Sequence, residues 1–341
     1  MTALETYRHL VRRYVTSTLI LAAALTSLVI TSLSVGTTHL GFKEIINYML
    51  GLEVDTLHRG LIELRMVRTL AAALTGASLG VSGVLIQGVT RNPLAEPYIL
   101  GISSTALSVV SLALIMNPSL INSRFEVVMI SFLGAVLGFL LTLLLSRLGS
   151  SGFSLVLAGV AVTSISSGIA HLLLYLLQSI LRIPYVYLLM GSTTSVLKSD
   201  IPILASVTLC GALVAVLMSK PLNAYVYGDE YSKQLGFNPR TTLLIATTAT
   251  SLLTGSAVAV VGIVGFVGLA APHIARYLVG SDHRFSSTAS ALLGANLVIL
   301  SDIVVRAISS VSNLGELPLG VVTGIIGAPI LAYLVLRRVR E

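Results

Sequence analysis

Three arginines at the predicted ends of apolar stretches are the side chains best suited to bind a charged partner. Arg65 and Arg68 are three residues apart, so they lie on one face of a helix. Arg306 follows Asp302 by four residues and can pair with it within a helix. A charge buried in lipid costs about 2.5–3.5 kcal/mol on insertion scales, so such residues need partners or water. These arginines predict either docking of an acidic partner or local charge neutralisation.

A polar segment between two apolar stretches, residues 222–239, is a second candidate site. It reads LNAYVYGDEYSKQLGFNP and places Asp229 and Lys233 on a short amphipathic helix. A glycine stands at each end of that helix, at Gly228 and Gly236, as expected for a short and rigid projecting helix. The segment predicts either a solvated connection or a helix that docks against a cytoplasmic partner.

The segment RNPLAEPYILG, residues 91–101, contains two prolines within five residues. Pro93 and Pro97 stop one helix and allow another to begin. Asn92 can cap the new helix, with Pro93 in its first turn. The segment predicts either an ordinary capped turn or a gate loop beside a transport pathway.

Metal and nucleotide chemistry have little support in the sequence. The six histidines lack the spacing of metal ligands and stand at positions 9, 39, 58, 171, 273 and 283. The sequence has no phosphate-binding loop of the GxxxxGK[ST] type. We therefore expect no catalytic residue, no metal and no bound cofactor in this chain.

The elements that position the candidate sites are predicted to be membrane-spanning helices. Hydrophobic residues make up 55% of the 341 residues and charged residues 10%, and the mean hydropathy is +0.94. A soluble domain has about a quarter charged residues. This composition excludes a soluble enzyme and a disordered chain, and the single cysteine, Cys210, excludes a disulfide scaffold. We expect one all-α polytopic membrane domain over residues 1–341.

Stretches without Lys, Arg, Asp or Glu predict ten spans, because a spanning helix needs about 20 mainly apolar residues. The first of them is too long for the apolar region of a signal peptide, about 7–15 residues, so we read it as a retained span. The longest charge-free stretch, 241–275, is divided in two at its glycines. The predicted spans are 14–35, 65–88, 96–116, 125–146, 153–177, 198–219, 240–260, 263–280, 286–308 and 317–337.

Ten spans place both termini on one side of the membrane. If that side is cytoplasmic, 13 of the 21 Lys and Arg residues lie inside and 8 lie outside. Positive residues collect in cytoplasmic loops, so this distribution favours an N-in, C-in orientation. The same excess of positive residues in cytoplasmic loops explains the net charge of +7, so binding of nucleic acid need not be assumed.

The two halves of the chain share landmarks that suggest an inverted repeat of spans 2–5 and 7–10. Spans 2 and 7 cross the membrane in opposite directions in the predicted topology. Inverted repeats with interrupted helices are common in transporters. A shift of 179 residues superposes Thr75-Gly76 on Thr254-Gly255, Gly83 on Gly262, Pro93 on Pro272 and Gly101 on Gly280.

Five segments, in order, resemble the FecCD-type, BtuC-like permeases of ABC importers for iron-siderophores, haem and vitamin B12. The resemblance extends from the second span to the C-terminus, and the first 60 residues match in hydropathy alone. The matching stretches are LRMVRTLAAALTGASLGVSGVLIQGVTRNPLAEPYILG (64–101), LVLAGVA (155–161), YGDEYSKQLGFNP (227–239), GFVGLAAPHIARYLVGSDHR (265–284) and SDIVVRAISSVSNLGELPLGVVTGIIGAPI (301–330).

The resemblance implies a BtuC-like type II importer fold with ten spans and cytoplasmic termini, in the plasma membrane of a prokaryote. It also implies a homodimer that binds two ABC ATPase subunits inside and one solute-binding protein outside. ATP and Mg would be bound by the ATPase, so the chain itself would not be an enzyme. Movement would follow from differential nucleotide affinity between two states of the complex.

The resemblance assigns roles to individual residues. Gly228, Asp229, Lys233, Gln234, Leu235 and Gly236 would dock against the ATPase. Arg65, Arg68 and Arg306 would meet acidic residues of the binding protein. The gate residues would be Asn92 and Leu94, with Ser150, Ser151, Gly152 and Phe153 in a second gate loop. Two departures from the family pattern are Met66-Val67-Arg68, in place of Leu-Pro-Arg, and the glycine- and serine-rich stretch 149–154.

Family frequency favours an iron complex as the substrate, with cobalamin next and molybdate or tungstate less favoured. An ion-coupled secondary transporter is a further alternative. It would need ionisable groups in mid-membrane, and the predicted spans are built from stretches that contain no Lys, Arg, Asp or Glu. An intramembrane enzyme would need clustered His, Asp or Ser-Lys pairs within the bilayer, and the sequence contains no such cluster.

Overall fold

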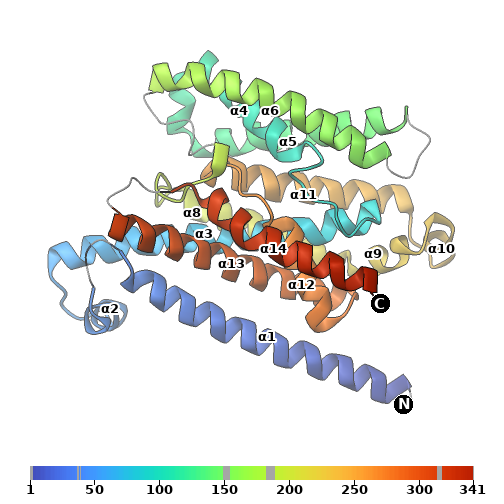
Figure 1. Cartoon of the computed structure of the whole chain (residues 1–341), viewed down its shortest axis with the longest axis horizontal. Coiled ribbons are helices and arrows are strands. Elements are labelled where there is room, and N and C mark those ends of the chain that lie inside the picture. Colours follow the sequence, from blue (N-terminus) through green and yellow to red (C-terminus); the bar gives the residue numbers. More distant parts are fainter. Residues whose placement is uncertain are drawn as a thin grey trace.

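The computed structural model is a bundle of helices (Figure 1). It describes residues 3–36, 38, 40–148, 154–181, 189–312 and 317–340, and these residues form helices and connections without a strand. The helices are α1 (Ala3–Ser34), α2 (Phe42–Met49), α3 (Thr56–Thr90), α4 (Ile102–Met116), η1 (Pro118–Asn122), α5 (Arg124–Ser146), α6 (Ser154–Leu181), α8 (Asp200–Leu217), α9 (Ser219–Val226), α10 (Asp229–Gln234), α11 (Pro239–Val261), α12 (Val267–Val279), α13 (His283–Ser312) and α14 (Leu319–Arg340).

Each of the ten predicted spans overlaps one helix of at least 13 residues. Two helices begin well before their predicted spans. Helix α1 begins at Ala3 rather than residue 14, and α3 begins at Thr56 rather than residue 65. The additional turns of α3 carry the charged pair Arg59 and Glu63, four residues apart, with 3.4 Å between Nε and Oε1. Such a pair supports a helix in water, so the helix extends beyond its apolar part.

Seven of the described helices are long and apolar enough to cross a membrane. Helices α4 and α12 are shorter, with 15 and 13 residues, and so is the apolar part of α14, Leu319–Pro329. We expected residues 96–101 and 263–266 to be helical, but both stretches are non-helical connections. Most of their residues are buried, and non-helical backbone is tolerated at membrane depth where protein surrounds it.

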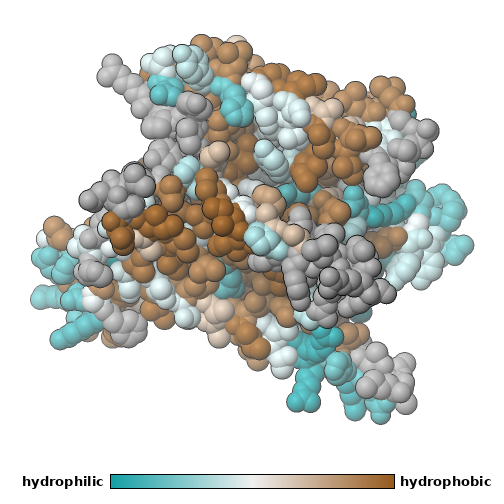
Figure 2. Space-filling model, in the orientation of Figure 1, coloured by the Kyte–Doolittle hydropathy of each residue, from teal (hydrophilic) through white to brown (hydrophobic). Residues whose placement is uncertain are grey.

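The surface has the apolar character expected of a protein in lipid. Large hydrophobic side chains are exposed on outward-facing helices, including Leu19 of α1 and both Leu209 and Leu213 of α8. Figure 2 shows apolar residues over the middle of one face, with hydrophilic residues gathered toward its two ends. A soluble protein of this size would expose large apolar patches only at binding sites.

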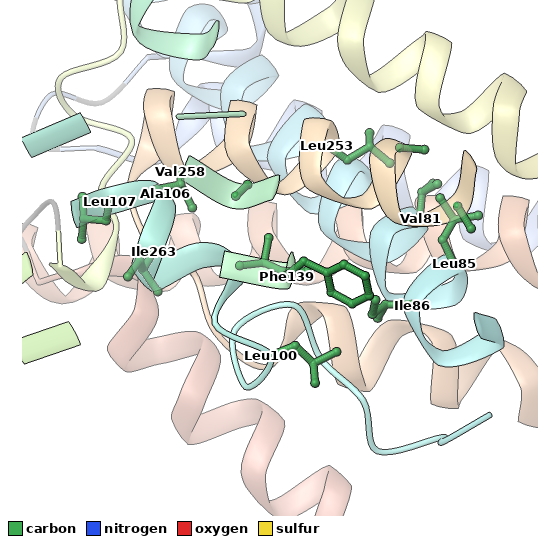
Figure 3. Close-up of a cluster of buried hydrophobic side chains, with 14 of the residues drawn as sticks. Val81, Leu85, Ile86, Leu100, Ala106, Leu107, Phe139, Leu253, Val258 and Ile263 are labelled. Carbon is green, nitrogen blue, oxygen red and sulfur yellow. The ribbon is translucent and has the colours of Figure 1, made fainter. Parts of the chain in front are cut away.

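Helix α3 is the centre of the bundle. In its most apolar window 78% of the residues are buried, compared with 6% for the peripheral α1. It packs against α13, α11, α8 and α12, while α4, α5 and α6 form a second group above it in Figure 1. The core between these groups contains Leu85 and Ile86 of α3, Phe139 of α5 and Leu253 of α11 (Figure 3).

Helices α3 and α11 run antiparallel, because α9 and α10 contact the end of α3 and lead into the start of α11 (Figure 1). This agrees with the opposite directions predicted for spans 2 and 7. Beyond these two helices the shift of 179 residues does not align equivalent elements. Pro93 lies in a connection, whereas Pro272 lies inside α12. The inverted repeat stays a prediction.

Both ends of the described chain lie at the end of the bundle that carries α10, and α2 lies at the opposite end (Figure 1). Arg13, near the start of α1, donates a hydrogen bond of 3.0 Å to the carbonyl of Tyr277, near the end of α12. We call these two ends of the bundle the α10 end and the α2 end. Termini at a common end agree with an even number of spans.

Candidate functional site

A short helix projects at the α10 end. It is α10, which has six residues, and it follows α9 directly. Gly228 and Gly236 flank it with φ angles of +118° and +83°, in the region that favours glycine. Ser232 is fully buried at its centre, so α10 is packed against the bundle on one face. The predicted short helix between two glycines is confirmed, and the positive φ angles explain the glycines.

The other face of α10 and its flanks are exposed. Lys233 pairs with Glu230 at 2.7 Å on this face, and both side chains are more than half exposed. Tyr227 and Leu235 are 77% and 53% exposed, and the ring of Tyr227 packs edge-on against that of Tyr231. Exposed aromatic and apolar side chains among charges are typical of a protein–protein contact surface. The two tyrosines were not among the residues assigned to this site from the sequence.

Residues 91–101 form a loop at the same end of the bundle. The side chain of Asn92 accepts a hydrogen bond of 2.9 Å from the N–H of Leu94, and Leu94 is 46% exposed. Asn92 therefore caps a turn within the loop. The expectation that it begins the next helix was wrong, because α4 begins at Ile102, after the second proline. Pro97 keeps the backbone out of a helix at that point.

A buried polar network holds the loop against α3 and α12. The Gln87 amide donates to the carbonyls of Ala95, at 3.1 Å, and Gly268, at 3.3 Å. Arg276 donates to the Gln87 side-chain oxygen. The Glu96 carboxylate accepts the N–H of Phe266, just before α12. Because Gln87 and Glu96 contact both the loop and α12, the loop is fixed on both sides.

The three predicted docking arginines lie together at the α2 end. Arg65 is buried and donates to the carbonyls of Leu33 and Ser34 at 2.9 and 3.0 Å and to that of Thr38. Arg306 is buried and donates to the carbonyl of Ser32, within the end of α1, and to that of Val35, just after it. Both guanidinium groups thus bind backbone carbonyls at or just after the end of α1.

Asp302 joins two of these arginines. Its carboxylate lies 2.8 Å from the guanidinium groups of both Arg68 and Arg306, and it also accepts a hydrogen bond of 2.5 Å from Thr193. The predicted pairing of Asp302 with Arg306 within one helix is therefore confirmed. We call Arg65, Arg68, Asp302 and Arg306 the arginine cluster. It connects α3, α13 and the end of α1, and the docking role of its arginines stays a prediction.

Two further groups at the α10 end were not recognised from the sequence. Arg91 contacts the polar segment 222–239 at Tyr225. Asn223 of α9 binds the start of α13, where its side chain meets Asp282 and His283 at 2.7 Å. Sequence alone gave no signal for these pairs because their partners are distant along the chain. The predicted second gate loop, Ser150, Ser151, Gly152 and Phe153, lies outside the described residues.

The fold and the site define a class of protein: a helical membrane protein with apolar flanks, a polar contact surface at one end and buried charge clusters near both ends. Its sequence from residue 22 to residue 337 matches the FecCD transport family. The chain belongs to this family, so the predicted resemblance is confirmed.

Characterised relatives agree with a permease subunit. FhuB, the iron(3+)-hydroxamate import system permease protein of Bacillus subtilis, is 37% identical over 84% of this chain and 73% of its own. HmuU, the hemin transport system permease protein of Yersinia pestis, is 33% identical over 81% and 83%. BtuC, the vitamin B12 import system permease protein of Vibrio cholerae, is 37% identical over 81% and 82%. The chain is a transport permease of this kind.

Solved structures support the fold. An ABC transporter described as of metal-chelate type, in an inward-facing conformation, is 27% identical and matches with a TM-score of 0.77, covering 94% of this chain and 98% of that one. PsaBC from Streptococcus pneumoniae matches with a TM-score of 0.60 over 85% of this chain and 95% of its own. At 17% identity this second likeness bears on the fold alone.

Proposed function

We propose that this chain is the membrane permease of a binding-protein-dependent ABC importer that moves a metal chelate into the cell. The observation that carries the proposal is the α10 helix. It is held between two glycines with positive φ, and its outer face and flanks expose Tyr227, Tyr231 and Leu235. A rigid projection with exposed apolar groups at the polar end of a membrane protein suits docking into a groove of an ATPase.

The proposed topology has ten spans with both termini in the cytoplasm of a prokaryote, across its plasma membrane. The common end of the two termini and α10 supports this topology, and so do the 13 Lys and Arg residues predicted for that side. Helices α4, α12 and α14 would complete the spans together with the buried connections beside them. All of residues 1–341 would form one transmembrane domain.

The proposed assembly is a homodimer with two ABC ATPase subunits and one extracytoplasmic solute-binding protein. The ATPase would contact Gly228, Asp229, Lys233, Gln234, Leu235 and Gly236, and the ATP and Mg would be bound by that subunit. The binding protein would dock at the α2 end near Arg65, Arg68 and Arg306. Arg68 is the most accessible of the three, and its side chain is 13% exposed. Docking through charges mainly orients the partner and speeds its encounter.

ATP binding would close the ATPase pair and move α10, and this movement would open one gate and close the other. Asn92 and Leu94 would form the gate at the α10 end, with Ser150, Ser151, Gly152 and Phe153 in a second gate loop. The difference in nucleotide affinity between the two states must supply the free energy of the shift. The chain itself would make and break no covalent bond.

We propose an iron complex, a siderophore or haem, as the substrate. Relatives named for iron(3+)-hydroxamate and hemin support this choice. Cobalamin is the second candidate, because the vitamin B12 permease is as similar to this chain as the hydroxamate permease, at 37% identity. Molybdate or tungstate import and ion-coupled secondary transport have less support.

Reconstitution of the complete importer in proteoliposomes tests the proposal. The complex would hold this chain, its cognate ATPase and its binding protein, loaded with a ferric siderophore, haem or cobalamin. We expect ATP-dependent uptake and stimulated ATP hydrolysis with an iron complex. Stimulation by cobalamin alone would change the substrate and keep the mechanism. Uptake that follows an ion gradient without an ATPase would overturn the proposal.

A further inference from the structure

Arg91 contacts both α9 and α10, the two short helices at the α10 end. Its Nε donates a hydrogen bond of 2.8 Å to the carbonyl of Tyr225, and its guanidinium carbon lies 4.2 Å from the centre of the Tyr225 ring. A terminal nitrogen of the same group pairs with the Asp229 carboxylate, the first residue of α10. One side chain therefore holds a hydrogen bond, a cation–π contact and an ion pair at once.

The backbone of Arg91 belongs to the gate loop. Arg91 follows the last residue of α3 and has a φ of +51°, in the left-handed region that few residues other than glycine adopt. The next residue is Asn92, whose side chain binds the N–H of Leu94. The path from α10 to the predicted gate thus consists of one side chain and one peptide bond.

We propose that Arg91 is a positioning residue that transmits the ATP-driven movement of α10 to the gate loop. This inference rests on the proposed function. The planar guanidinium stacks on the tyrosine ring and donates in its plane at the same time, which a lysine ammonium cannot do. A shift of α9 and α10 therefore carries Arg91 along, and Asn92 with it.

Removal of the Arg91 side chain should leave the fold intact. The Arg91–Asp229 pair is partly exposed, with side-chain exposures of 37% and 54%, and such pairs contribute little to stability. Helix α9 also has a second attachment. Asn223 accepts a hydrogen bond of 3.0 Å from the N–H of His283 and donates one of 2.7 Å to Asp282. This attachment keeps α9 in place when Arg91 is shortened.

The test compares Arg91→Ala and Arg91→Lys in the complete reconstituted importer. ATP hydrolysis and substrate uptake are measured on the same proteoliposomes. We expect Arg91→Ala to keep ATP hydrolysis within about twofold while uptake falls about tenfold, so that less substrate moves per ATP. Arg91→Lys keeps the charge opposite Asp229 and should show a smaller loss. Lys220→Ala, which removes an exposed cation from α9, is the control and should transport normally.

The outcomes separate this inference from the proposed function. Normal uptake by Arg91→Ala in an active importer would overturn the role of Arg91 alone, and so would parallel losses of hydrolysis and uptake. No ATP-dependent uptake by the wild type would overturn the proposed function and this inference with it. If Arg91→Ala aggregates on size exclusion, the inference is judged on Arg91→Lys, where an unchanged ratio of uptake to hydrolysis would contradict it.

Discussion

Asp302→Ala should prevent the accumulation of folded permease. Asp302 is fully buried and is the carboxylate shared by Arg68 and Arg306. Its removal would take away the carboxylate that both guanidinium groups contact in the interior. Breaking a buried ion pair by removal of one partner costs about 3–5 kcal/mol, a large part of the stability of a typical protein. Size-exclusion profiles and thermal melting in detergent would measure the loss.

Two further variants make this result specific. Asp302→Asn keeps the size of the side chain and can still accept from Thr193, so we expect a smaller loss of stability than with alanine. Asp55→Ala removes an exposed acid at the same end of the bundle and should behave as wild type. Equal melting temperatures for Asp302→Ala and Asp55→Ala would show that the arginine cluster has no structural role. Its arginines would then be more available for docking.

The second large effect is expected at the crossing of α3 and α13. An added Cβ at Gly76 would lie 2.1 Å from the carbonyl oxygen of Gly294, and one at Gly294 would lie 2.0 Å from that of Gly76. Both obstacles are backbone atoms, so the two helices would have to separate. Small residues at such crossings let helix backbones approach closely within a membrane.

Gly76→Ala should therefore destabilise the bundle by about 3 kcal/mol, the upper end of what overpacking costs. Gly60→Ala is a matched control on the same helix, because a Cβ there meets no atom within 4 Å. Alanine favours a helix over glycine, so the control should be neutral or slightly stabilising. Melting temperatures in detergent would compare the two. Equal values would show that α3 and α13 can separate at no cost.

The positions of the long helices were predictable from the sequence. Charge is excluded from the hydrocarbon, so gaps between charged residues mark the helices directly, and each predicted span overlaps one helix of at least 13 residues. The pairing of Asp302 with Arg306 was also predictable, because it lies within one helix and depends only on a spacing of four residues. The short α10 followed from its glycines and polar residues.

The full extent of the non-helical backbone at residues 96–101 and 263–266 was not predicted. Apart from Glu96 and Pro97, these residues are as apolar as those of a helix, and hydropathy does not distinguish a buried connection from a span. Tertiary contacts decide whether these stretches are helical, because Gln87 and Glu96 bind backbone groups that a helix would otherwise satisfy internally. The same contacts place the start of α4 after Pro97.

Sequence alone determined which segments are apolar enough to enter a membrane and which short helix projects, because these features depend on local composition and spacing. It also carried the motifs that identify the family. Tertiary structure decided which distant residues meet: Arg91 with Tyr225 and Asp229, Asp302 with Arg68, and Gly76 with Gly294. These contacts join residues more than 130 positions apart, and only the packing of the helices brings them within reach.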